Sequence, residues 1–250
     1  MCGTIRMQDY IDVPIHQRNK MSVLQDSDYF ISGKVLLSYL NELVGLVGEK
    51  SVIMVLKRSG WIDQVRKIVN KRHEKTAPYK ALVEINQHVE DIFGPTSLRT
   101  LVYSAAKRSF ASSFGGTEVI KETLHWLHQK PESTLRLRVS LETITHLIQA
   151  TSDQKIKIDE SSSHYHLTFY KCVACWGVED KRSPYCFYNV GFIRGGLHYL
   201  FGKDDYPVQE LACSATGDKA CEFIVRKFPF NDNERGSGKT GFLTLPDHLR

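Results

Sequence analysis

The sequence of 250 residues lacks the long apolar run that a membrane-spanning helix requires. It also lacks, near its start, the apolar segment of a signal peptide. Positive charge is not concentrated, because 33 Lys and Arg against 28 Asp and Glu give a net charge of +5 and lie scattered along the chain. A nucleic-acid-binding protein usually gathers such charge on one face. We therefore expect a cytoplasmic location, no membrane span and no nucleic-acid partner.

Signatures of common enzymes are also missing. The sequence contains no Gly-x-Gly-x-x-Gly fingerprint for a nicotinamide or flavin cofactor, and no evident nucleophile or pair of catalytic acids. The segment Gly236-Ser-Gly-Lys-Thr240 resembles the end of a P-loop, but position 233, where the first glycine of that motif belongs, is Asn. These absences disfavour nucleotide binding and lead us to expect a protein that is not an enzyme in its own right.

What the sequence does contain is an uneven distribution of cysteine. Cys2 stands alone, whereas the other five of the six cysteines fall between Cys172 and Cys221. In a reducing compartment, thiols that cluster in this way indicate metal binding or redox chemistry more than disulfides.

Hydrophobic periodicity divides the chain into two halves. Apolar residues recur at helical spacing in a series of segments from Phe30 to Lys130, and less clearly over Leu135–Ala150. Beyond them, alternation predicts two strands, a helix and a hairpin, which lie at 155–159, 164–170, 185–201, 208–214 and 221–228. We expect an α+β fold with a helical N-terminal half packed on an antiparallel sheet. We also expect an N-terminal extension over 1–29, one domain over 30–228 and a flexible polar tail over 229–250.

The second half contains a possible set of metal ligands. Glu210 and Cys213 lie three residues apart on a predicted strand, Cys221 starts the next strand, and Cys186 opens the preceding helix, whose dipole favours a thiolate. Three thiolates and one carboxylate suit a closed tetrahedral zinc site. The alternative is three free cysteines buried in a core, where cysteine is common.

Cys172-Val-Ala-Cys175 forms a Cys-x-x-Cys pair with several possible roles. It could be redox active, although the βαβ context of thioredoxin-like sites is missing. It could instead be half of a metal site that Cys186 completes, or a loop with two incidental thiols.

The C-terminal half resembles the 4-vinyl reductase domain family. The resemblance rests on Pro184-Tyr-Cys186, which leads into a glycine-containing helix, on Glu210-Leu-Ala-Cys213, and on Gly217-Asp-Lys-Ala-Cys-Glu-Phe223. Members of this family are small-ligand-binding modules, found in bacterial regulators that sense aromatic compounds and in proteins linked to bacteriochlorophyll synthesis. In the phenol-sensing members, zinc is held at the positions that correspond to Cys186, Glu210, Cys213 and Cys221. The resemblance thus implies a structural zinc ion at these residues.

The resemblance also implies a small apolar or aromatic ligand between the helices and the inner face of the sheet. Candidate ligand-binding residues are aromatic or imidazole side chains of the predicted strand and its following loop: His164, Tyr165, His166, Phe169, Tyr170 and Trp176. They could equally be ordinary sheet residues. Further alternatives are a structural adaptor without a ligand and an accessory factor in tetrapyrrole metabolism. An amphipathic helix over Val35–Val47 could form a homodimer, and a signalling output would require an unidentified protein partner.

Overall fold

The computed structural model describes residues 29–71, 73–130, 133–202 and 206–228. The expected tail over 229–250 and the expected extension, apart from Tyr29, lie outside the described residues. The division of the chain into these three segments stays a prediction.

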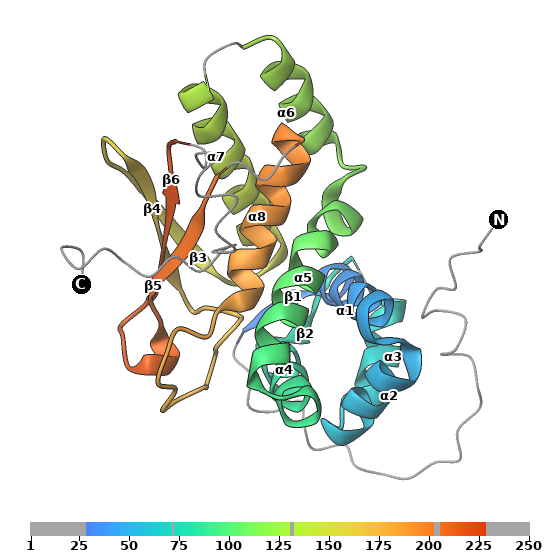
Figure 1. Ribbon diagram of the computed structural model, residues 1–250. Coiled ribbons are helices and arrows are strands. Elements are labelled where there is room, and N and C mark those ends of the chain that lie inside the picture. The colour runs from blue at the N-terminus through green and yellow to red at the C-terminus, as the bar shows by residue number, and fades with distance from the viewer. Residues whose placement is uncertain (1–28, 72, 131–132, 203–205, 229–250) are drawn as a thin grey trace.

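A four-stranded antiparallel sheet forms one side of the molecule (Figure 1). Its order is β3-β4-β6-β5, with strands at β3 Lys155–Glu160, β4 His164–Tyr170, β6 Cys221–Arg226 and β5 Val208–Ala212. Strand β4 pairs with β6 in the middle, so that Phe169 lies opposite Cys221. This arrangement places the N-terminal end of β6 beside the C-terminal end of β4, where the Cys172 loop begins.

Helices make up the rest of the described chain. Their bounds are α1 Gly33–Val47, α2 Glu49–Arg58, α3 Ile62–Asn70, α4 Tyr79–Phe93, α5 Pro95–Phe114, α6 Glu118–His128, α7 Ser133–Thr151 and α8 Phe187–Phe201. The expected α+β fold is confirmed, and the ambiguous segment over Leu135–Ala150 is part of helix α7.

Three details differ from the sequence-based expectation. A two-stranded sheet of β1 (Phe30–Ser32) and β2 (Lys75–Pro78) was not predicted, because strands of three and four residues are too short to show a period. Helix α5 begins at Pro95, so Thr96 is not its N-cap; proline suits the first helical position because its fixed φ is already helical. Helix α8 begins after Cys186, two residues later than expected.

Helix α8 runs between the sheet and α5 (Figure 1). Eleven of its fifteen residues are buried, as in a helix that is covered on nearly all sides. Glycines allow this burial: a Cβ atom on Gly191 would lie 2.3 Å from the backbone oxygen of Tyr103, and one on Gly195 would lie 2.1 Å from that of Lys107. The backbones of α5 and α8 therefore approach more closely than any side chain permits.

The apolar face of α1 is used within the chain. Leu36, Leu40 and Leu43 are buried in the core, and α1 packs extensively against α5. The homodimer that this helix was expected to form stays a prediction.

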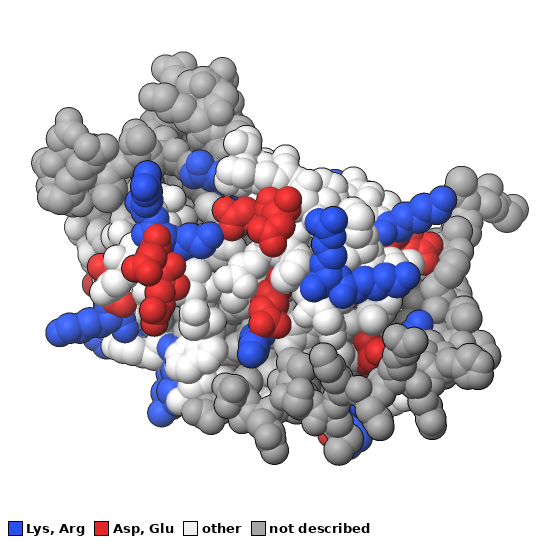
Figure 2. Space-filling view, turned by 90° about the horizontal axis from the view of Figure 1, so that it is seen from below, with Lys and Arg blue, Asp and Glu red and all other residues white. Residues whose placement is uncertain are grey.

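The described surface matches the scattered charge of the sequence. On the face seen in Figure 2, Lys and Arg side chains lie next to Asp and Glu side chains among uncharged residues. Among the described residues, no helix is both long and apolar enough to cross a membrane.

We predict that Gly195→Ala destabilises the protein by about 1–3 kcal/mol, because its methyl group would overpack the contact with Lys107. The matched control is Gly45→Ala in α1, where an added Cβ meets nothing within 4 Å. That substitution should instead stabilise by up to about 1 kcal/mol, because alanine favours helix. Urea unfolding of both variants measures the difference, and equal effects would refute the close approach.

Candidate metal centre and ligand cavity

Five cysteines and one glutamate meet at the N-terminal end of α8. They come from the loop after β4, the residue before α8, the strand β5 with its following turn, and the start of β6: Cys172, Cys175, Cys186, Glu210, Cys213 and Cys221. All five cysteines are buried and none forms a disulfide. Segments far apart in the sequence thus contribute sulfur atoms to one place in the core.

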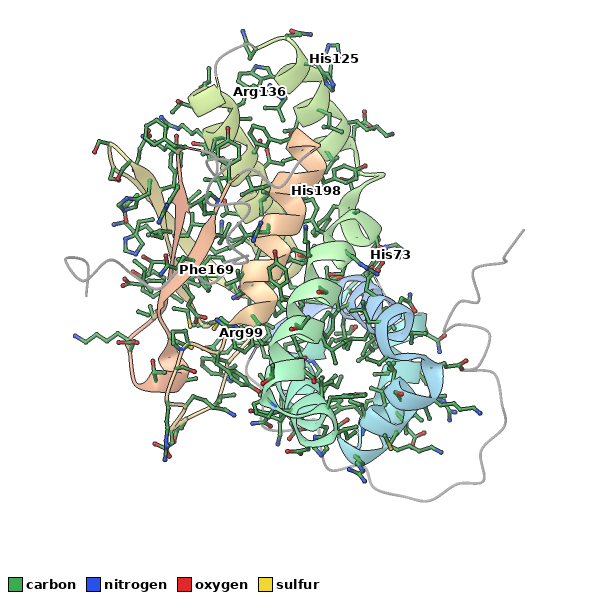
Figure 3. All side chains as sticks on the ribbon, in the orientation of Figure 1. His73, Arg99, His125, Arg136, Phe169 and His198 are labelled. Atoms are coloured by element: carbon green, nitrogen blue, oxygen red, sulfur yellow. The ribbon has the colours of Figure 1, made fainter. Side chains whose placement is uncertain are left out.

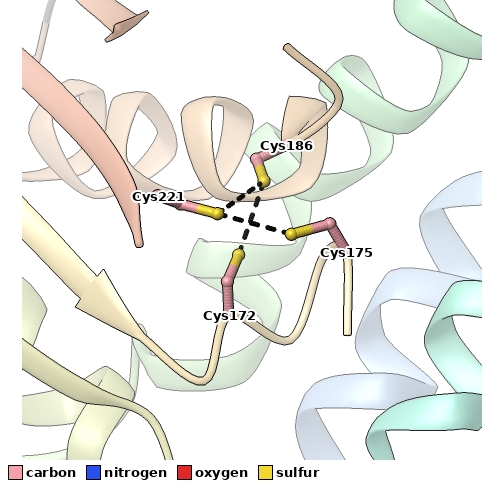
Figure 4. A group of neighbouring side chains, drawn as sticks. All are labelled: Cys172, Cys175, Cys186 and Cys221. Carbon is pink, nitrogen blue, oxygen red and sulfur yellow. Dashed lines mark hydrogen bonds between the residues drawn. The ribbon is translucent and has the colours of Figure 1, made fainter. Parts of the chain in front are cut away.

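The sulfur atoms lie close to one another (Figure 4). The Sγ atom of Cys186 is 3.4 Å from that of Cys172, 3.5 Å from that of Cys221 and 3.6 Å from that of Cys213. The Sγ atoms of Cys175 and Cys221 are 3.3 Å apart. Around a tetrahedral zinc ion with bonds of about 2.3 Å, ligand sulfurs lie roughly 3.8 Å apart, so the observed spacing is close to that of a metal site.

The expected ligand set is one of two overlapping groups in this cluster. The donor atoms of Cys186, Glu210, Cys213 and Cys221 all lie within 4.8 Å of one another. The backbone N–H of Cys186 donates to Oε2 of Glu210 at 3.0 Å. The other carboxylate oxygen, Oε1, is buried without a hydrogen-bond partner among the described residues. A buried oxygen left without a partner is costly, and a metal ion would satisfy it.

Local backbone features aim these donors. Residues three apart on a regular strand point to opposite faces, which would separate Glu210 from Cys213. The β5–β6 register shifts between Glu210 and Ala212, and a bulge of this kind re-aims the side chains that follow it. The turn after β5 is held by Asp218, whose carboxylate accepts from the backbone N–H of Cys213 at 2.9 Å.

The electrostatics fit a site that takes up a cation. Burial, followed by the nearby Cys213, raises the pKa of Glu210 to about 9. Burial also raises the pKa of the Cys186 thiol, whereas hydrogen bonds from Cys172 and the other cysteines lower the pKa of Cys221. Negative charge in this cluster is costly without a cation, and thiolate with carboxylate is a donor set that zinc binds. The residues present therefore fit zinc.

The Cys172–Cys175 pair belongs to the same cluster. The donor atoms of Cys172, Cys175, Cys186 and Cys221 form the second group within 4.8 Å. The side-chain amide of Asn189 donates to the sulfur of Cys172 at 3.1 Å. Asn189 was not predicted from the sequence, although a polar amide one turn after Cys186 in an apolar helix was the available signal.

The candidate ligand-binding residues are not brought into one pocket. Tyr165 and Phe169 are buried on the inner face of the sheet (Figure 3 labels Phe169). His164 and His166 alternate to the other face and are half-buried, and Tyr170 is exposed. Trp176 lies in the loop with its ring 4.8 Å from that of Tyr29.

The outer-face histidines and the inner-face aromatic residues have separate partners. Nε2 of His166 lies 3.1 Å from a carboxylate oxygen of Glu222. Burial lowers the pKa of His164. On the inner side, the rings of Phe169 and Phe223 pack edge to face at 5.0 Å.

A small cavity lies beside α8, close to the cysteine cluster. Its volume is about 10 Å³, and it is lined by α1, α7 and α8 with their flanking residues: Ile31, Val35, Ile148, Thr151, Ser152, Gln154, Tyr188, Asn189 and Phe192. The hydroxyl of Tyr188 is buried and has no hydrogen-bond partner in the described part of the chain. Most of the lining is apolar, and this hydroxyl is a polar group able to anchor a guest.

A family model and one curated relative match the second half of the chain. The model of the vinyl-4-reductase domain family matches residues 165–227. An uncharacterized protein of Methanocaldococcus jannaschii is 33% identical over 79 residues, which are 32% of this chain and 43% of that protein. The chain therefore spans less than half the length of this relative.

Solved structures share the fold at low identity. The unliganded Fe(II) H-NOX protein from K. algicida gives a TM-score of 0.51 at 11% identity, covering 81% of this chain and 98% of that one. The Fe(II)NO form of an H-NOX protein from S. oneidensis gives 0.50 at 15% identity, covering 78% and 98%. The phenol-responsive sensory domain of the transcription activator PoxR, solved with phenol, gives 0.44 at 16% identity, covering 66% and 82%.

The family match begins at Tyr165 on β4 and ends at Lys227 after β6, so it contains the whole cluster of five cysteines and Glu210. The chain therefore carries a vinyl-4-reductase domain match within residues 165–227, which confirms its resemblance to the 4-vinyl reductase domain family.

Proposed function

We propose that this chain is a small-molecule-binding sensor or carrier module in which a structural zinc ion fixes the N-terminus of α8 to the β5–β6 hairpin. The observation that carries the proposal is the convergence of Cys186, Glu210, Cys213 and Cys221, whose donor atoms lie within 4.8 Å of one another. The three cysteines are fully buried, and the set is complete without water, as in structural rather than catalytic zinc sites.

The proposed ligand is a small apolar or aromatic molecule with one polar group. Its place is the cavity beside Tyr188, where Ile31, Val35 and Phe192 supply apolar contacts and the Tyr188 hydroxyl supplies the polar one. A volume of about 10 Å³ holds at most one water molecule. A ring-sized ligand therefore requires the surrounding side chains to move, as in a pocket that opens only in a minor conformation.

The same small volume favours a second candidate function. If the core does not open, the domain acts as a structural adaptor whose metal-pinned core presents a fixed surface to a protein partner. Edge-to-face packing of Tyr188 on Tyr39, at 5.2 Å between ring centroids, and its stacking on Phe192, at 5.6 Å, are typical of a well-filled core. Ligand binding in solution distinguishes these two functions.

For the metal, we predict that the purified protein contains zinc and that Cys213→Ser loses the ion held by this ligand set. The free energy of unfolding should fall by several kcal/mol, about 4 kcal/mol if free zinc exceeds Kd 1,000-fold. Elemental analysis and urea unfolding measure the two effects. The control is Ser214→Ala, whose hydroxyl lies 3.6 Å from the Cys221 sulfur but belongs to neither donor group. Zinc content unchanged by Cys213→Ser would contradict this ligand set.

For the ligand, phenol serves as a probe with one aromatic ring and one hydroxyl. We predict that phenol raises the Tm of the wild-type protein and that Tyr188→Phe weakens its apparent affinity about two- to tenfold, the value of one hydrogen bond. Tyr39→Phe is the matched control, because the Tyr39 hydroxyl already donates to Asn86 at 2.6 Å. An unchanged Tm with phenol and with longer apolar probes would support the adaptor instead.

A further inference from the structure

The cluster holds more donors than one metal ion can use. A tetrahedral ion takes four ligands, whereas five cysteines and Glu210 meet here. With only the set of Cys186, Glu210, Cys213 and Cys221 occupied, Cys172 and Cys175 would remain as unused thiols in direct contact with metal ligands. The contacts are short, at 3.4 Å from Cys172 to Cys186 and 3.3 Å from Cys175 to Cys221.

The six donors divide into two complete tetrahedral sets. One set is Cys186, Glu210, Cys213 and Cys221, and the other is Cys172, Cys175, Cys186 and Cys221. The sets share two sulfurs, those of Cys186 and Cys221, which lie 3.5 Å apart. Thiolate sulfur has enough lone pairs to bridge two metal ions. Four donors for each of two ions, with two donors shared, account for all six side chains.

Hydrogen bonds prepare the second set for a cation. The amide of Asn189 donates to Cys172 at 3.1 Å, and the backbone N–H of Ser214 donates to Cys221 at 3.3 Å. Donors that point at sulfur stabilise the thiolate over the thiol, as partners outside the ligand shell do in metal sites. Asn189 is itself buried. Its amide would have little reason to face a neutral thiol, which is a weak acceptor.

Charge and access point the same way. Five thiolates and one carboxylate carry −6; one divalent ion leaves −4, and a second leaves −2, which lowers the cost of burying the cluster. A surface pocket of about 300 Å³ is lined by Cys172, Cys175, Trp176 and Ser214 among others. Cys172 and Cys175 are 3% and 2% exposed, whereas Cys186, Cys213 and Cys221 are fully buried. The pocket gives a metal ion a route to the outer set.

We infer that Cys172, Cys175, Cys186 and Cys221 bind a second divalent, thiolate-preferring metal ion, with Cys186 and Cys221 bridging it to the first. This inference rests on the proposed zinc set and adds to it a dinuclear centre at the N-terminus of α8. The second ion joins the loop after β4 to the helix and the hairpin (Figure 4). The Cys-x-x-Cys pair is thus a ligand pair.

Metal counting on the full chain tests the inference. Elemental analysis after loading with zinc should give two ions per wild-type chain, one in Cys172→Ser/Cys175→Ser, and one in Glu210→Gln/Cys213→Ser. Circular dichroism establishes that each variant is folded. One ion per wild-type chain that Cys172→Ser/Cys175→Ser retains overturns the second site and leaves the proposed zinc set standing. One ion that only Glu210→Gln/Cys213→Ser retains overturns both assignments.

Cobalt tests the bridge without any variant. Co(II) alone, added to the metal-free wild-type chain, should bind at two equivalents. Its electron paramagnetic resonance signal should grow with the first equivalent and fall with the second, because shared thiolates couple the two spins. Signals that add in proportion to both equivalents, or binding that saturates at one equivalent, would overturn the shared centre.

Discussion

The burial of α8 on nearly all sides is the constraint on which the rest of this structure depends. A helix covered by the sheet, α5 and α7 must approach its neighbours closely, and Gly191 and Gly195 allow this at α5. It must also begin inside the protein, where the first N–H groups of a helix need partners. Glu210 supplies one, by accepting from the backbone N–H of Cys186. The start of α8 therefore coincides with the place where acidic and thiol donors gather.

A metal ion resolves the energetic problem that this arrangement creates. The raised pKa of Glu210, at about 9, reflects a carboxylate that burial penalises. Close sulfur atoms from three separate segments have no apolar reason to converge on that carboxylate. Divalent cations make the same contacts favourable and tie the Cys172 loop, α8 and the hairpin into one unit. Asn189 contacts the Cys172 sulfur and also lines the cavity beside Tyr188, so that ligand binding and metal binding would act on the same helix.

Periodicity predicted most of the architecture, and the errors have local physical causes. The long amphipathic helices and the alternating strands of the main sheet emerged clearly, because one face of each is buried. The short strands β1 and β2 did not, since Phe30–Ser32 and Lys75–Pro78 offer too few residues to show alternation. The start of α5 was misplaced because the preference of Pro95 for the first helical position outweighed the capping tendency of Thr96.

The candidate metal ligands could be named from motif spacing, because they lie in a short segment whose turn residues are distinctive. The placement of Cys172 and Cys175 against them could not, since it depends on how the loop after β4 folds back onto α8. The proposed ligand residues show the same limit of sequence reasoning. Alternation correctly separated His166 from Tyr165, but Tyr188 lines the cavity from another element and no local pattern marks it.

The most direct test of this account is amide hydrogen exchange of the wild-type protein with its metal and after removal by a chelator. If metal pins α8, the amides of its first turns and of the β5–β6 hairpin should lose protection together. Those of α2 and α3, which pack against α1 and α4 and lie away from the hairpin, should keep theirs (Figure 1). Unchanged protection of α8 and the hairpin in the metal-free protein would contradict the central claim that bound metal holds this helix in place.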